Sequence, residues 1–259
     1  MNSLGIAWRS IRYFLLSVDE HSLHSPFLFD FYNQVIKDQN EKNSSWIQIE
    51  ATRKKLLSDQ RKLEVIDYGA GSGRNPLRKI SEIARISLNT PARCRLVSRI
   101  IRNYECKTIL ELGTSLGINT LYLSRSIPSA KVWTVEGCPR ISEVAGKCFE
   151  EHKVKNVKLI TGNIDHVLLP LINNLPPFDL VYFDANHLYE PTLRYYNAVK
   201  QKAHQGSIFI FDDIYWSDGM FQAWQEIIKS PELDLSIELY DLGIIFFKKF
   251  EHKQHFILR

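Results

Sequence analysis

The chain has 259 residues, of which 44% are hydrophobic and 24% charged, and its net charge at pH 7 is +4. These values are typical of a globular protein with a sizeable core. The weak positive charge falls well short of the clustered Lys and Arg of a nucleic-acid binder, so no nucleic-acid partner is expected. Four cysteines without a CxxC pair indicate reduced thiols in a cytoplasmic protein, and neither a zinc site nor a disulfide framework.

The first 104 residues are predicted to form a helical extension. The apolar stretch 4–18 contains Arg9 and Arg12 and is too short for a membrane span, so we expect an amphipathic helix, with a peripheral membrane role as the lesser alternative. Ser25 followed by Pro26 is typical of a helix start. Helices are predicted over residues 10–18, 26–37, 46–63, 76–87 and 91–104.

From residue 105 onward, short apolar runs alternate with helical patterns, which favours βαβ units and a parallel sheet. Strands are predicted over residues 108–112, 131–135, 157–161, 180–183, 207–211, 235–240 and 243–248, and helices over 119–126, 140–152, 164–174, 190–201 and 216–229. The last two strands are too close in the chain for a crossover and must be antiparallel. The expected fold is therefore α/β, a Rossmann-like seven-stranded, mostly parallel sheet with an antiparallel last strand, plus the N-terminal helical extension. The domains would be 1–104 (extension or cap) and 105–259, with 248–259 as a solvated tail.

A glycine loop at Gly113-Thr114-Ser115-Leu116-Gly117 lies between the first of these strands and a helix. Glycines let a backbone approach a ligand closely, and a helix N-terminus offers N–H groups. Glu136 ends the next strand, 25 residues after Glu111 (136 − 111), which suits a carboxylate on ribose hydroxyls. The order strand, loop, helix, strand and terminal acid predicts a nucleotide-like ligand.

A second glycine-rich segment, residues 67–73, is followed by no strand ending in an acid at the right distance. Two interpretations stay open for it. It is either a turn that joins helices, or a lid or wall over the substrate pocket.

The segment Glu111-Leu112-Gly113-Thr114-Ser115-Leu116-Gly117, taken with Glu136, resembles the first two motifs of class I S-adenosylmethionine (SAM)-dependent methyltransferases. The resemblance covers about residues 95–250 and is strongest to small-molecule O-methyltransferases of the catechol and caffeoyl-CoA type. Residues 24–27 and 69–72 are also similar to segments of uncharacterised bacterial methyltransferases.

This resemblance implies a set of cofactor-binding residues. Those expected around the methionine and ribose parts of SAM are Glu111, Gly113, Thr114 and Gly117; the one expected at the ribose hydroxyls is Glu136; those expected at adenine are Asn163 and Asp165. Gly137 is expected at the cofactor without a stated part, as is Asp184. Asp165 has an alternative role in the first turn of a helix, where its charge favours the helix dipole.

Asp184 and the pair Asp212-Asp213 each follow a predicted buried strand. Ligands of open α/β sheets bind at the carboxyl ends of strands, and a group of carboxylates there suits Mg²⁺. The resemblance to catechol-type enzymes implies a metal site at Asp184, Asp212 and Asp213, with Asp184 also at the cofactor and in catalysis. It aligns His187 with the family's catalytic lysine. A histidine can accept the acceptor's proton near neutral pH, or it can simply hydrogen-bond within its loop.

The expected function is SAM-dependent methyl transfer to oxygen of a small hydroxylated molecule, assisted by Mg²⁺ if the carboxylates bind it. Three alternatives remain: methylation of nitrogen or of a macromolecule, a non-catalytic SAM-fold binding protein, and an NAD-dependent oxidoreductase. The last is disfavoured because the loop is not GxGxxG. The expected partner is a small-molecule methyl acceptor; no membrane span is expected, and a homodimer stays open.

Overall fold

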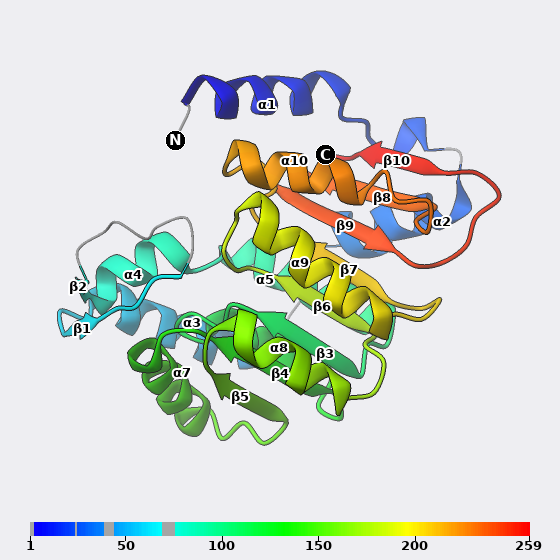
Figure 1. Ribbon diagram of the computed structural model, residues 1–259. Helices are drawn as coiled ribbons and strands as arrows, with labels where there is room; N and C mark the ends of the chain where they lie inside the picture. The colour runs from blue at the N-terminus through cyan, green and yellow to red at the C-terminus, as the bar shows by residue number, and fades with distance from the viewer. Residues whose placement is uncertain (1–2, 24, 39–43, 69–75) are drawn as a thin grey trace. The chain divides into compact units, whose positions relative to one another are not determined.

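The computed structural model describes residues 3–23, 25–38, 44–68 and 76–259 (Figure 1). The chain divides into two compact units. The central unit is Asn33–Val167, and the terminal unit combines Met1–Tyr32 with Leu168–Arg259. The expected boundary between residues 104 and 105 stays a prediction; both residues lie within the central unit. His24 and the glycine-rich residues 69–73 lie outside the described residues.

The strands of the central unit form the predicted parallel arrangement. They are β3 (Thr108–Leu112), β4 (Lys131–Glu136) and β5 (Val157–Thr161), in the order β3-β4-β5. The helices α6 (Ile118–Ser126) and α7 (Pro139–Glu151) connect them, and α8 (Ile164–Asn173) follows β5. Their bounds lie within two residues of the predicted ones, because long apolar runs with helices between them define βαβ units clearly.

The earlier part of the central unit differs from the prediction. It contains α3 (Ser44–Ser58), β1 (Lys62–Glu64), β2 (Leu77–Lys79), α4 (Ile80–Ser87) and α5 (Pro91–Asn103). β1 and β2 pair antiparallel, where the sequence pattern predicted the ends of two helices. Three-residue strands are too short for a period of two to be distinguished from a helix end, which explains the error.

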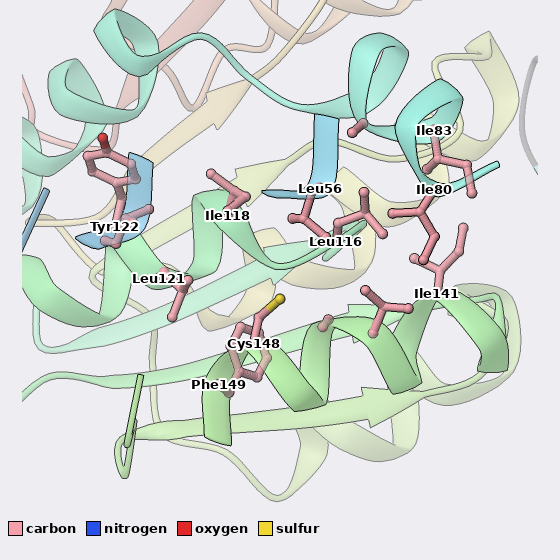
Figure 2. Close-up of a cluster of buried hydrophobic side chains, with 14 of the residues drawn as sticks. Leu56, Ile80, Ile83, Leu116, Ile118, Leu121, Tyr122, Ile141, Cys148 and Phe149 are labelled. Carbon is pink, nitrogen blue, oxygen red and sulfur yellow. The ribbon is translucent and has the colours of Figure 1, made fainter. Parts of the chain in front are cut away.

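The helices around this hairpin share a hydrophobic core with α6 and α7. Figure 2 shows Leu56 and Ile80 directed toward Leu116, Ile118 and the side chains of α7. The core is close-packed, and it fixes the β1–β2 hairpin on the same structure that carries the glycine loop. Cys138 and Cys148, like Cys94 and Cys106, are buried and are not in disulfide bonds.

The strands of the terminal unit run in the order β6-β7-β9-β8-β10 (Figure 1). They are β6 (Leu180–Phe183), β7 (Ile208–Phe211), β8 (Leu235–Leu239), β9 (Leu242–Phe246) and β10 (Gln254–Ile257). β9 is antiparallel to both β7 and β8, whereas the β6–β7 and β8–β10 pairs are parallel. The antiparallel strand is therefore confirmed. The helical segments between them are α9 (Tyr189–Val199), η3 (Lys200–Lys202) and α10 (Asp218–Ile227).

The eighth strand, β10, corrects the expectation of seven strands and of a solvated tail. Leu258 is fully buried, and the His255 ring is within 2.8 Å of the Ser236 hydroxyl. β10 pairs in register with β8, so that Gln254 lies opposite Leu235. The strand has only four residues, Gln-His-Phe-Ile, which is too short a pattern to predict a strand without the pairing with β8.

The N-terminal helices of the terminal unit are α1 (Ser3–Leu16), η1 (Glu20–Ser22) and α2 (Pro26–Phe31), followed by the single π turn η2 (Tyr32–Lys37). Arg9 is buried and pairs with Asp218, while Trp8 and Leu15 are exposed. Arg12 also faces the protein, because its guanidinium pairs with the buried Glu238 at 3.0 Å. Among the described residues, each helix is too short or too polar to cross a lipid bilayer.

Candidate active site

The predicted cofactor loop follows β3 and turns sharply through left-handed backbone. Gly113 has φ 101°, Ser115 has φ 48° and Gly117 has φ 85°. Gly117 is the N-cap of α6, and a Cβ built on it would lie 2.8 Å from a ring carbon of Phe149. Both the backbone conformation and this contact require glycine. The loop is anchored by the Gly113 N–H, which donates to the Val135 carbonyl at the end of β4.

Glu111 lies beneath this loop and is fully buried. Its carboxylate accepts hydrogen bonds from Asn119 Nδ2 at 2.9 Å, from the Thr134 hydroxyl at 2.6 Å and from the Thr120 hydroxyl. Burial raises the pKa of Glu111 to about 7, although these three donors act in the opposite direction. The Glu111 carboxylate of β3 thus forms hydrogen bonds with side chains of α6 and β4, and these bonds hold the elements on both sides of the glycine loop together.

Thr114 belongs to the same buried network. It is 2% exposed, and its hydroxyl is within hydrogen-bonding distance of the Thr134 hydroxyl. The side chain thus points into the protein, and only the backbone at Thr114 is left for a ligand. Its role at the cofactor stays a prediction, as does that of Glu111.

Glu136 joins the end of β4 to the loop after β3. Its Oε2 accepts the Ser115 N–H at 2.8 Å, and its Oε1 accepts the Cys138 N–H at 2.9 Å. Burial is the largest cause that raises the pKa of Glu136 to about 7, and the charges of Glu111 and Asp67 add to it. Glu136, the residue predicted to bind the ribose, therefore lies next to the glycine loop.

The remaining predicted cofactor residues of the central unit follow β4 and β5. Gly137 comes directly after Glu136, and the Gly162 N–H donates to the Glu136 carbonyl at 2.9 Å. Asn163 caps α8, because its Oδ1 accepts the Asp165 N–H at 3.0 Å. Asp165 is exposed in the first turn of that helix. Their contact with adenine stays a prediction, and the structural alternative for Asp165 matches its position.

In the terminal unit, Asp184 and His187 lie together after β6. His187 Nε2 is 3.6 Å from Asp184 Oδ1. Asn186 and His187 are consecutive left-handed residues, with φ 72° and 48°, a conformation that non-glycine residues adopt at a cost and that is frequent at functional sites. The Ser217 hydroxyl donates to the His187 carbonyl at 2.9 Å and holds this turn in place.

Two buried polar atoms of this turn stand out. Asn186 Oδ1 and His187 Nδ1 have no hydrogen-bond partner among the described residues. Burial lowers the pKa of His187, although the nearby Asp212 charge opposes this. The ring is thereby favoured in its neutral form, with an imidazole nitrogen available to accept a proton. The Asn186 oxygen was missed by sequence reasoning, and its position beside a strand-end acid and a histidine was the available signal.

The other two predicted metal ligands follow β7. Asp212 is 1% exposed; its Oδ1 accepts the Asp213 N–H at 2.9 Å, and its Oδ2 accepts the Tyr182 hydroxyl. Within residues 3–23, 25–38, 44–68 and 76–259, no three His, Cys, Asp or Glu side chains are grouped so that they could hold a metal ion. Asp184, Asp212 and Asp213 thus do not fit a ready-made Mg²⁺ site, and metal binding stays a prediction.

The comparisons with known proteins agree with the loop and strand geometry. Residues 110–214 match a family model described as a methyltransferase domain. A catechol O-methyltransferase from Niastella koreensis is 25% identical over 128 residues, covering 48% of this chain and 57% of the relative. An O-methyltransferase from Aspergillus hancockii is 28% identical over 159 residues, covering 57% and 60%. The chain therefore matches less than two thirds of either relative's length.

Solved structures show the same fold. A methyltransferase from Podospora anserina bound to S-adenosylhomocysteine (SAH) superposes with a TM-score of 0.62 at 16% identity, covering 88% of this chain and 97% of that one. An O-methyltransferase from Bacillus cereus in complex with SAH gives 0.59 at 16% identity, covering 83% and 96%. At these identities the likeness concerns the fold alone.

The family match over residues 110–214 and the curated relatives confirm the predicted resemblance to SAM-dependent methyltransferases. Within that class, the curated relatives that it matches are O-methyltransferases by name.

Proposed function

We propose that this protein transfers the methyl group of SAM to a hydroxyl oxygen of a small molecule. The observation that carries the proposal is the Glu136 carboxylate, which ends β4 and accepts the Ser115 N–H of the glycine loop. This arrangement suits a nucleoside whose ribose hydroxyls meet an acid and whose other end meets a loop backbone. The names of the matched O-methyltransferases, one of them a catechol enzyme, support transfer to oxygen and a small acceptor.

The residues of the central unit fit SAM. Each Glu136 oxygen accepts one N–H, and because a carboxylate oxygen can accept a second hydrogen bond, ribose hydroxyls can be added. Asn119 Oδ1 is buried and lacks a donor among the described residues, which the ammonium group of SAM would supply. We assign the loop backbone at Gly113 and Gly117 to the methionine part. We assign Asn163 and Asp165 to adenine.

The chemistry needs a base, and we assign that role to His187. When bound, SAM supplies an electrophilic methyl group on a sulfonium. Asp184 Oδ1 lies 3.6 Å from Nε2, and a neutral imidazole has one nitrogen that can take the proton of the acceptor hydroxyl. The oxygen then keeps the electron pair that bonds to the methyl carbon, and the pair of the broken carbon–sulfur bond stays on sulfur. Alignment of the oxygen with that bond is the main further requirement.

No step of this scheme is routed through a metal ion, because no three acidic, His or Cys side chains among the described residues are grouped so that they could hold one. The predicted Mg²⁺ assistance at Asp184, Asp212 and Asp213 is decided by the same assay that identifies the acceptor.

The test is a methyl-transfer screen over catechols, phenols and hydroxy acids, with SAH formation and the methylated product both measured. Each reaction is run with Mg²⁺ and with EDTA. We expect an O-methylated product at the same rate in both. A rate that EDTA abolishes and Mg²⁺ restores would instead support the metal site. A product methylated on nitrogen, or SAH binding without turnover on any acceptor, would contradict the proposal.

A further inference from the structure

The β1–β2 hairpin of the central unit ends beside the carboxyl end of β4. The ladder extends past β1, because the Val65 N–H donates to the Pro76 carbonyl at 2.7 Å. The next residue, Ile66, directs its N–H at Cys138 Sγ, 3.4 Å away. Cys138 also contacts the Glu64 carbonyl, at 3.8 Å from Sγ. The hairpin therefore contacts the chain at Cys138, two residues after Glu136. The hairpin itself belongs to neither the glycine loop nor β4.

Tyr68 lies directly on the backbone of Gly137. A Cβ built on Gly137 would be 2.9 Å from Tyr68 Cδ2 and 3.3 Å from Cε2. Real Cβ atoms do not come so close, so the tyrosine ring occupies space that only a glycine leaves open. Tyr68 is 48% exposed, so half of its side chain remains accessible next to the residue that we assign to the ribose.

Asp67 directly precedes Tyr68 in the chain, so its backbone lies next to the contact between Tyr68 and Gly137. Its charge is one of those that raise the pKa of Glu136, after burial and the charge of Glu111. Two nearby carboxylates repel each other unless hydrogen-bond donors or cations relieve them. A ribose offers two hydroxyl donors, and SAM as a whole is cationic at sulfur.

We propose that Asp67 and Tyr68 are cofactor-binding residues: Asp67 shares the ribose hydroxyls with Glu136, and the Tyr68 ring packs against the nucleoside over Gly137. This inference rests on the proposed function, because it takes SAM to be the ligand at Glu136. A segment of the N-terminal extension thereby completes the nucleoside site. The competing explanation is purely structural: the hairpin covers the core through Val65 and Cys138, and Tyr68 only shields Gly137.

The hairpin offers matched controls. Ile66 is 49% exposed and two residues from Tyr68, so Ile66→Ala removes a comparable apolar side chain without touching Gly137. Glu64 is an exposed carboxylate of the same hairpin, so Glu64→Gln is the control for Asp67→Asn. SAH affinity and thermal stability are measured for the full-length protein and the four variants, by calorimetric titration and thermal unfolding.

We expect Tyr68→Ala and Asp67→Asn each to weaken SAH binding by about tenfold, the size of one lost aromatic or hydrogen-bonding contact, with the controls unchanged. A second titration uses 2′-deoxy-SAH. The unmodified protein should bind 2′-deoxy-SAH more weakly than SAH. This difference in affinity should be smaller in Asp67→Asn, because the substitution and the missing hydroxyl remove the same contact.

Gly137→Ala separates packing from binding. It should lower both stability and SAH affinity by displacing Tyr68, while the double variant Gly137→Ala/Tyr68→Ala should regain stability without regaining affinity. If the unmodified protein does not bind SAH, the proposed function fails. If it binds SAH and the Tyr68 and Asp67 variants bind as tightly as their controls, the function stands and this inference is wrong.

Discussion

Glu136 and Ser115 are joined by a hydrogen bond of 2.8 Å, from the serine N–H at the centre of the glycine loop to the carboxylate that ends the neighbouring strand. Ser115 also has a hydroxyl 2.7 Å from the Ser87 hydroxyl at the end of α4. The loop is therefore held from both sides before any ligand arrives. A site of this kind loses little conformational entropy on binding.

Replacing Glu136 by Gln tests the acid directly. The amide group would direct N–H atoms at a backbone N–H of Ser115 or Cys138, and it would offer a weaker acceptor to the ribose. We expect SAH affinity to fall roughly 30-fold or more, measured by calorimetry. Glu143→Gln, an exposed acid on α7 that pairs with Arg140, is the control and should bind normally. Equal affinity in both variants would contradict the assignment of Glu136.

SAH binding should also depend on pH. The pKa of Glu136 is raised to about 7 mainly by burial, so part of the protein carries a protonated carboxyl at neutral pH. Ribose hydroxyls donate to the ionised form and favour it. Affinity should therefore rise with pH through about 7 and level off above it. Titrations in buffers of different ionisation enthalpy should show proton release near pH 7, and a flat profile from pH 6 to 8 would contradict this account.

His187 can be tested against a second histidine of the terminal unit. His204 Nε2 is 3.1 Å from Asp179 Oδ1, so it forms a similar pair with an acid, but before β7 rather than after β6. His187→Gln should lower kcat on the identified acceptor by about 100-fold or more and leave SAH affinity unchanged. His204→Gln should leave both unchanged. Equal effects of the two substitutions on kcat would rule out the assigned base.

Glu238 gives a pH-dependent test of stability in the terminal unit. Burial alone would raise its pKa, but hydrogen bonds from His255, Tyr215 and Trp224 lower the pKa to about 2. A carboxylate whose pKa is lowered on folding stabilises the fold above about pH 4.5, and that contribution is lost as the pH falls through about 2.

Glu238→Gln should therefore reduce the free energy of unfolding by about 3 kcal/mol at pH 7, and the difference from the unmodified protein should shrink toward pH 3. Urea unfolding at pH 7, 5, 4 and 3 measures it. Glu232→Gln, at an exposed acid that pairs with Lys200, is the control. A difference that stays constant over this range would show that packing, and not the charge, explains the loss.

The strands that carry the site were predictable because each is a short, strongly apolar run that ends in an acid or a glycine. Glu136 and Asp184 were predicted as site residues in this way, and their roles stay predictions; the match over residues 110–214 falls on the same segment. The β1–β2 hairpin and β10 were not predictable, because three or four partly polar residues become a strand only through their partners.

Other features of the site depend on contacts between elements distant in the chain. Glu111 is buried, and the donors that satisfy its carboxylate lie on α6 and β4. No local sequence pattern distinguishes such an acid from one that contacts a ligand. The left-handed pair Asn186 and His187 is equally hidden, since both residue types are common in ordinary loops. The position of Tyr68 on Gly137 follows from the docking of the hairpin, which the sequence pattern did not predict.

The central claim is that the crevice between the glycine loop and the end of β4 binds the SAM nucleoside. A crystal structure of the full-length protein with SAH measures this most directly. The account predicts that the ribose hydroxyls lie within hydrogen-bonding distance of the Glu136 carboxylate, with the methionine part along the backbone at Gly113 and Gly117. A crystal in which SAH binds away from Glu136, or leaves this crevice empty at saturating concentration, would contradict it.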